Sequence, residues 1–138
     1  MNDNLCICIS LRKAANHISK LYDYELSALD IKITQYCTLK YIKDLGNPTI
    51  NELSRKQDLE RTTVLRNLDK LKKVDLISYK KNDISKIKVI TLTVNGIKKL
   101  KEAEVIWEKT QQKFLNAFGL NNKKEFDLFM NKISKLNF

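Results

Sequence analysis

The chain has 138 residues and a formal net charge of +10, from 26 Lys and Arg against 16 Asp and Glu. This length suits one domain with a single core, while three cysteines without paired metal-ligand spacing and a single histidine argue against a disulfide framework and a structural zinc site. No apolar run approaches the length that spans a bilayer, and the chain starts with acidic Asp3 rather than a basic segment, so we expect a cytoplasmic protein with no membrane contact, metal or cofactor.

The first predicted element is a long amphipathic helix over about residues 4–29. At about 1.5 Å per residue it would be roughly 35 Å long, which exceeds what a small domain covers by itself. We therefore expect part of its apolar stripe to contact another subunit. The stripe recurs at steps of three and four residues and consists of Cys8, Leu11, Ala15, Ile18, Tyr22, Leu26 and Leu29.

A second helix is predicted to begin with Thr34 as its N-cap and to end at Gly46. The only proline, Pro48, introduces a short extended piece at residues 49–50, which we expect to add a third strand to the sheet described below. We expect the buried side chains of this helix to be among Tyr36, Leu39, Tyr41, Ile42 and Leu45.

Residues 52–77 have the spacing of a helix-turn-helix. Thr49 and Glu52 match a capping box, which predicts where its first helix starts, and Leu53 belongs to the buried side of that helix. In the second helix the apolar positions recur at helical steps, so we expect a buried stripe made of Val64, Leu65, Leu68 and Leu71.

The other side of that second helix is polar and basic, and we call it the reading face. Arg, Thr and Asn side chains pair with base edges or phosphates, and a row of them at the start of a helix suits insertion into a major groove. A solvated amphipathic helix would have the same pattern, so the following elements decide between the two interpretations. The reading face consists of Arg61, Thr62, Thr63, Arg66, Asn67 and Lys70.

Two runs of β-branched and aromatic residues follow, at 76–80 and 87–92, and a polar segment with Asn-Asp turn chemistry separates them. They predict a two-stranded hairpin. Helix, turn, helix and hairpin in this order form a winged helix, whose basic hairpin, the wing, lies along the DNA backbone or reaches a minor groove. The charges that would hold the backbone here are those of Lys80, Lys81, Lys86 and Lys88.

The positive charge is concentrated in the same part of the chain. From Arg55 to Lys101 there are 14 Lys and Arg against 5 Asp and Glu, whereas both flanks are nearly neutral. A basic stripe with neutral ends indicates a polyanion at one face, and double-stranded DNA is the first candidate.

Two helices are predicted after the wing, with Gly119 between them. The first follows Thr93 and carries Ile97, Leu100, Ala103, Trp107, Phe114 and Phe118 on one face. Asn121 or Asn122 can cap the second. So many aromatic side chains far from the reading face favour helix pairing between subunits, although closure of the monomer core is the alternative. The stripe of the last helix is Phe126, Phe129, Met130, Ile133 and Leu136.

The predicted fold is mainly α with a small β-hairpin (α+β): a winged helix-turn-helix lobe at residues 31–93 between long dimerisation helices at 1–30 and 94–138. The whole chain resembles the MarR family of winged-helix transcriptional regulators. The matching segments are Leu11-Arg12, Tyr22-Asp23, Thr34-Gln-Tyr36, Glu52-Leu-Ser54, residues 61–71 and Leu92-Thr-x-x-Gly96. The resemblance implies a homodimer, formed by the first and last helices, that regulates transcription, as a repressor, from a pseudo-palindromic operator with half-sites about 10 bp apart.

The chain departs from the family pattern at three places. Asp58 and Asp75 stand where the family usually has glycine, before and after the recognition helix. Aspartate tolerates a left-handed backbone better than most residues, so we expect the fold to survive at a modest cost. In the wing, Lys81 and Asp83 align with the family's Asp-x-Arg signature, so the arginine that enters the minor groove is missing.

The resemblance also implies release of DNA by a small, amphipathic or phenolic effector in a crevice between the dimerisation helices and the DNA lobes. We expect helix one and the helix starting near Val94 to line this crevice, with Arg12 or His17 near an acidic effector. Oxidation of a cysteine in helix one is the other known route, and Cys6 and Cys8 are the candidates here. The alternative is that these two and Cys37 are small buried hydrophobic residues.

Two other classes of function compete with DNA-binding regulation. An enzyme has almost no support, because the sequence has no phosphate-binding glycine loop, no His-Glu-x-x-His and no Gly-x-Ser-x-Gly. A winged helix used only for protein contacts is the stronger alternative. Salt discriminates between the two, since DNA binding through several phosphates falls steeply with salt concentration.

Overall fold

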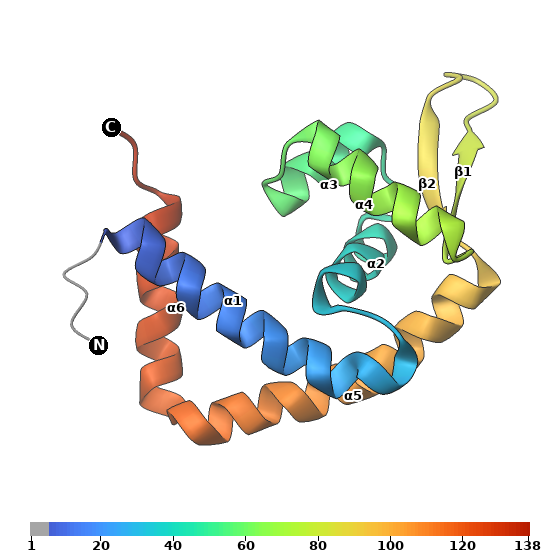
Figure 1. The fold of residues 1–138 in the computed structure, drawn as a ribbon. Helices are drawn as coiled ribbons and strands as arrows, with labels where there is room; N and C mark the ends of the chain where they lie inside the picture. Colours follow the sequence, from blue (N-terminus) through green and yellow to red (C-terminus); the bar gives the residue numbers. More distant parts are fainter. Residues whose placement is uncertain (1–5) are drawn as a thin grey trace.

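An arm of long helices carries a winged-helix lobe (Figure 1). The structure is a computed structural model that describes residues 6–138. Helices α1 (Ile7–Leu26), α5 (Val94–Phe118) and α6 (Leu120–Ser134) form the arm. The lobe contains α2 (Ile33–Leu45), α3 (Ile50–Gln57), α4 (Arg61–Lys73) and the hairpin of β1 (Ile77–Lys81) and β2 (Lys88–Leu92). A 3₁₀ turn, η1 (Ser27–Leu29), follows α1. The predicted α+β winged-helix class is confirmed; the predicted helix start at Asn4 lies outside the described residues.

The core of the lobe lies where α2, α3, α4 and the hairpin meet. Three of the four residues predicted as the buried stripe of α4 are fully buried, but Leu65 is 39% exposed, so its assignment to the core was wrong. Because successive residues of a helix are about 100° apart, the Leu65 side chain points about a quarter turn around the helix axis from the stripe of Val64, Leu68 and Leu71. The side chains that fill this core are Leu39, Ile42, Leu53, Val64, Leu68, Leu71, Ile77 and Ile90.

The beginning of α2 is fixed by the end of α1 rather than by Thr34. The helix starts at Ile33, so the predicted Thr34 cap is wrong, and Thr34 lies in the first turn. The backbone N–H of Ile33 donates instead to Asp23 Oδ1 at 2.8 Å, and that of Lys32 donates to Gln35 Oε1 at 2.9 Å. A carboxylate from α1 therefore satisfies an amide that would otherwise have no partner and ties the arm to the lobe.

The predicted cap of α3 is confirmed, and the predicted third strand is wrong. Thr49 Oγ1 accepts a hydrogen bond from the Glu52 N–H at 3.2 Å, which makes Thr49 the N-cap and leaves Ile50 in the helix. This segment makes one backbone hydrogen bond to the hairpin, in which the Ile90 N–H donates to the Pro48 carbonyl at 2.8 Å. Among the described residues the sheet contains only β1 and β2.

Aspartates occupy the two left-handed positions that flank α4, as the sequence predicted. Asp58 has φ 52° and Asp75 has φ 57°. The Asp75 carbonyl accepts from the Thr93 hydroxyl at 2.6 Å, and its carboxylate accepts from Asn95 at 2.8 Å, so this turn also fixes the start of α5. The sharp turn on each side of α4 sets the direction of the helix relative to α3 and the wing.

Because the backbone at Asp58 is left-handed, glycine should fit there better than any side chain with a Cβ. We expect Asp58→Gly to raise the free energy of unfolding by about 0.5–1 kcal/mol and Asp58→Ala to lower it by roughly 0.5 kcal/mol. Urea denaturation of the two variants and the parent chain measures both. Equal stability of the glycine and alanine variants would contradict the left-handed turn.

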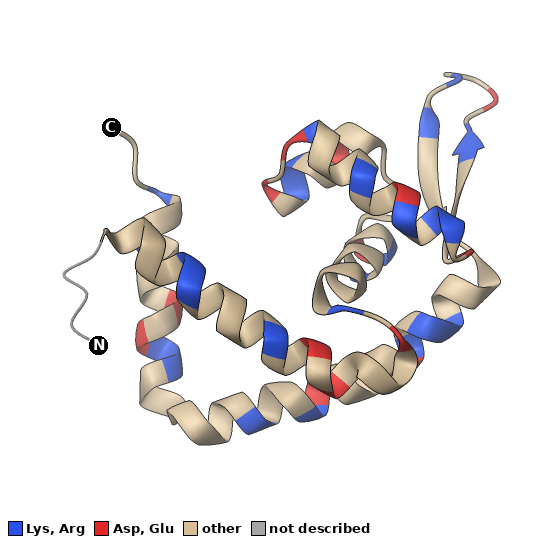
Figure 2. Ribbon diagram, viewed as in Figure 1, with Lys and Arg blue, Asp and Glu red and all other residues tan. Residues whose placement is uncertain are grey.

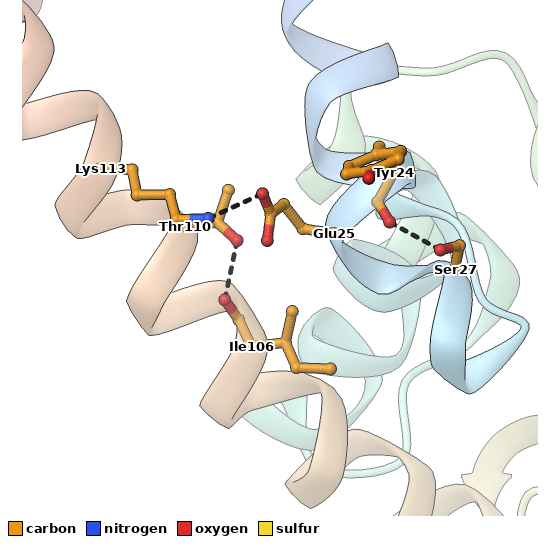
Figure 3. A network of polar contacts seen from close by, with 6 residues as sticks. All are labelled: Tyr24, Glu25, Ser27, Ile106, Thr110 and Lys113. Carbon is orange, nitrogen blue, oxygen red and sulfur yellow. Dashed lines mark hydrogen bonds and ion pairs between the residues drawn. The ribbon is translucent and has the colours of Figure 1, made fainter.

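The arm is held together where the C-terminal part of α1 packs against α5 (Figure 1). The Tyr22 and Phe114 rings have their centroids 5.0 Å apart. Figure 3 shows the polar part of the contact, where Lys113 Nζ lies 2.8 Å from Glu25 Oε1. Of the predicted stripe on α1, Leu26 is buried, whereas Cys8 and Ala15 are exposed.

Among the residues that the structure describes, none of the helices combines the length and the apolar character that a membrane span requires.

The last helix leaves its apolar stripe largely exposed. Gly119, with φ 82°, ends α5 as predicted, but α6 begins directly at Leu120, so neither Asn121 nor Asn122 is its cap. Asn122 donates backwards to the Phe118 carbonyl at 2.8 Å. No residue of α6 is buried, and Phe126 and Phe129 are 54% and 50% exposed. The alternative that this helix closes the monomer core is therefore wrong.

Candidate nucleic-acid interface

The reading face of α4 is presented to solvent because the opposite side of the helix is packed into the core of the lobe. Arg61, Thr62, Arg66 and Lys70 are exposed, and Thr63 and Asn67 are half-buried. The Arg61 guanidinium donates to the side-chain oxygen of Asn51 in α3. This contact joins the two helices of the helix-turn-helix at the N-terminal end of α4, where a helix entering a major groove meets the bases first.

Two residues of the reading face belong also to a second surface. Asn67 and Lys70 line a cavity of about 600 Å³ that lies between α4, the start of α2 and the end of α1. Arg66, one residue earlier, does not line it. The structure therefore divides the predicted set into residues outside the cavity and residues that line it. Asn67 and Lys70 line it, whereas the others do not: Arg61, Thr62, Thr63 and Arg66.

The predicted wing lysines are all exposed, on both strands and in the loop between them. Lys88 Nζ lies 4.4 Å from the centre of the Tyr79 ring, and Lys72 Nζ of α4 lies 5.4 Å from it. Tyr79 thus holds two ammonium groups at the junction of recognition helix and wing. Lys72 and Tyr79 were missing from the predicted site, because only the hairpin register brings this ring beside the end of α4.

Positive charge covers both parts of this surface. Figure 2 shows Lys and Arg along α4 and on both strands of the hairpin, with few acidic residues among them. Within α4 and the wing the exposed acids are Asp69, which pairs with Lys73 at 3.4 Å, and Asp83 at the wing tip; Glu60 and Asp75 are exposed just beyond the two ends of α4. A surface of this kind attracts a polyanion such as nucleic acid.

The loop at the wing tip is ordered by the side chain of Asn82, as its turn chemistry predicted. Asn82 Oδ1 accepts from the Ile84 N–H at 2.9 Å, and the Asn82 carbonyl accepts from the Lys86 N–H at 2.7 Å. Lys86 has φ 55°, which closes the turn back towards β2. Lys81 pairs with Lys88 at the end of the ladder, so charge stands on both sides of the tip.

The cavity has residues of both α1 and α5 in its lining, but neither of the two residues predicted to contact an effector. Arg12 and His17 are exposed on α1 and do not line it. The part of α1 that does is Asp23, eleven residues beyond Arg12 and about 16 Å along the helix. From α5 only Lys99 contributes, and its ammonium group donates to the Leu29 carbonyl at 2.8 Å.

The cysteines do not share one environment. Cys6 and Cys8 are exposed free thiols, so the alternative that they are buried hydrophobic residues is wrong within one chain. Cys8 Sγ accepts from Arg12 Nε at 3.4 Å. Cys37 is half-buried, and burial raises the pKa of its thiol. Because the thiolate is the reactive form, Cys37 is less suited to oxidation at neutral pH than an exposed cysteine. Within residues 6–138 no three His, Cys, Asp or Glu side chains cluster as metal ligands would.

No protein-family model and no curated protein matches the sequence, but the structure is similar to solved structures of DNA-binding proteins. A Mycobacterium tuberculosis transcriptional regulator, MosR, in complex with DNA has 26% sequence identity and a TM-score of 0.79, over 96% of this chain and 100% of that one. A mutant of Escherichia coli MarR complexed with operator DNA has 18% identity and a TM-score of 0.83, over 92% of each chain. Bordetella bronchiseptica BpsR, whose DNA binding is regulated by 6-hydroxynicotinic acid, has 15% identity and a TM-score of 0.85, over 99% of each chain.

Proposed function

Since the chain has the winged-helix fold of the MarR family, we propose that it is a sequence-specific double-stranded DNA-binding regulator of transcription, acting as a repressor in the cytoplasm. The observation that carries the proposal is the single basic surface formed by α4 and the wing, on a fold whose solved relatives include complexes with DNA. A catalytic role has no comparable support, because these relatives are described as regulators and DNA-binding proteins.

The regulator is a homodimer in this proposal. Residues 1–30 and 94–138 form the dimerisation region, and residues 31–93 form the DNA-binding lobe. The exposed stripe of α6 and the exposed start of α1 supply the apolar surface that a second copy would cover. A two-fold axis between the copies would place the two α4 helices in successive major grooves of a pseudo-palindromic operator, with half-sites about 10 bp apart.

Arg66 and Lys86 should have different roles on DNA. Arg66 is the exposed arginine in the middle of the reading face, and a bidentate contact with a base distinguishes that base by about 1–3 kcal/mol. We expect Arg66→Ala to reduce the preference for operator over random duplex roughly tenfold or more, and Lys86→Ala to weaken binding to both duplexes alike. Alanine keeps the Cβ of Lys86, so the left-handed backbone there is equally strained in the variant.

Fluorescence anisotropy with an operator selected from random duplexes measures both affinities. If Arg66→Ala kept the operator affinity and preference of the parent chain, the assignment of the reading face would be wrong. The slope of affinity against salt concentration separates this function from protein docking, since each phosphate contact adds about 0.9 to the slope for duplex DNA.

A small amphipathic or phenolic effector would act through the cavity beside α4. Lys32, Lys70 and Lys99 offer charge for an acidic group, and Leu71 and Val74 offer apolar surface. An effector that contacts Lys70 there competes directly with DNA. The alternative trigger is oxidation of Cys6 or Cys8. Adding 6-hydroxynicotinic acid to the operator complex tests release by an effector, and adding peroxide tests release by oxidation. Unaltered operator binding after confirmed thiol oxidation would exclude the oxidation route.

A further inference from the structure

The wing tip presents an isoleucine almost completely to solvent. Ile84 is 95% exposed, more than any other large hydrophobic residue of the described chain except the terminal Phe138, and Ile87 in the same loop is 52% exposed. Isolated apolar side chains on a protein surface are common. Ile84 lies in the loop between β1 and β2, and this basic hairpin extends away from the lobe (Figure 1).

The loop holds Ile84 in a defined position. The Ile84 N–H donates to Asn82 Oδ1 at 2.9 Å, the Asn82 N–H donates to the Ile87 carbonyl at 3.0 Å, and the Lys86 N–H donates to the Asn82 carbonyl at 2.7 Å. These bonds close the loop on itself. A partner that binds Ile84 therefore loses little free energy in ordering the tip.

The charges around Ile84 define the kind of partner. The exposed lysines of the wing stand on both sides of the tip, with Asp83 as its only acid: Lys80, Lys81, Lys86 and Lys88. An apolar side chain flanked by ammonium groups fits a surface that is anionic at its rims and apolar within. The minor groove has this arrangement, with phosphates along both edges and sugars and base edges between them.

We propose that Ile84 is an apolar wedge that enters the minor groove beside the major-groove site of α4 and partly opens one base step. This inference rests on the proposed function and adds a specificity determinant to it. The wing would then select by deformability, preferring the flexible pyrimidine–purine steps TA and CA/TG, in place of the charge-based recognition that an arginine provides.

The test uses the full-length chain and operator duplexes that carry 2-aminopurine at the flanking step, with TA or AA at that step. We expect the parent chain to raise the 2-aminopurine fluorescence and to prefer TA. Ile84→Ala should lose both effects, with about a tenfold fall in affinity. Ile84→Lys should retain affinity through its added charge and lose the preference. Val94→Ala, which truncates an 85% exposed residue outside the wing, should behave as the parent chain.

The outcomes separate this inference from the proposed function. If the parent chain bound no duplex even at low salt, both would be overturned. If it bound the operator and Ile84→Ala kept the same affinity, fluorescence change and step preference, the wedge would be wrong while DNA binding stood, and the wing tip would be left as a protein contact. A TA preference that survived in Ile84→Lys would likewise overturn the wedge.

Discussion

Gly96→Ala is expected to lower the free energy of unfolding by about 3 kcal/mol, although alanine is the better helix former by about 1 kcal/mol. Gly96 is buried in the first turn of α5, where its N–H donates to Thr93 Oγ1 at 2.9 Å. A Cβ at this position would lie 2.0 Å from the Leu76 carbonyl oxygen. That carbonyl also accepts from the Thr93 N–H at 3.1 Å, so it cannot turn aside without losing a hydrogen bond. The steric cost therefore exceeds the gain in helix propensity.

Urea denaturation of Gly96→Ala and the parent chain measures this loss. Val94→Ala is the matched control, because it changes the same turn of α5 at an exposed position and should alter the stability by less than about 0.5 kcal/mol. A Gly96→Ala variant as stable as the parent would contradict the close approach of α5 to the segment that leads into β1.

Phe129→Glu is expected to separate the proposed dimer. Half of the Phe129 side chain is exposed in the single chain, so the variant should fold, but a carboxylate at this position would be buried against the second copy. An unpaired buried charge costs several kcal/mol, which corresponds to a dimer dissociation constant raised roughly hundredfold or more. The affinity for the operator should fall when the dimer separates, because a monomer contacts one half-site in place of two.

Sedimentation at several protein concentrations measures the association, and anisotropy measures operator binding. Asn131→Glu is the control, since it adds the same charge to α6 about 200° around the helix from Phe129 and should leave the dimer intact. A Phe129→Glu variant that stayed dimeric would exclude this stripe from the interface. One that became monomeric and still bound the operator as tightly would contradict the role of two-fold symmetry.

Local sequence patterns predicted most of the elements because they depend on periodicity and turn chemistry. The capping pair at Thr49, the breaks at Gly46 and Gly119 and the left-handed aspartates on both sides of α4 all lie where the sequence indicated. Each of these features is decided by a residue and its neighbours within four positions. The exposure of the polar, basic side of α4 was predictable for the same reason, as it is one side of a regular helix.

The predictions failed where a contact joins segments far apart in the sequence. Asp23 caps α2 from the end of α1, which displaces the start of the helix from Thr34. Leu65 has the right residue type for the core, but it is 39% exposed, because it lies about a quarter turn around α4 from the buried stripe. The cavity is bounded by Asp23 and Lys99 rather than by Arg12 or His17, because the crossing of arm and lobe sets its place along α1.

The sequence by itself therefore determined the order of the elements, the winged-helix class and the basic character of α4 and the wing, since each follows from residue type and spacing along the chain. Only the tertiary structure decided that position 96 has no room for a Cβ, that Tyr79 gathers Lys72 and Lys88, and that α6 remains uncovered within one chain. Those facts depend on distances between elements, which are set by how the helices pack and which no local pattern specifies.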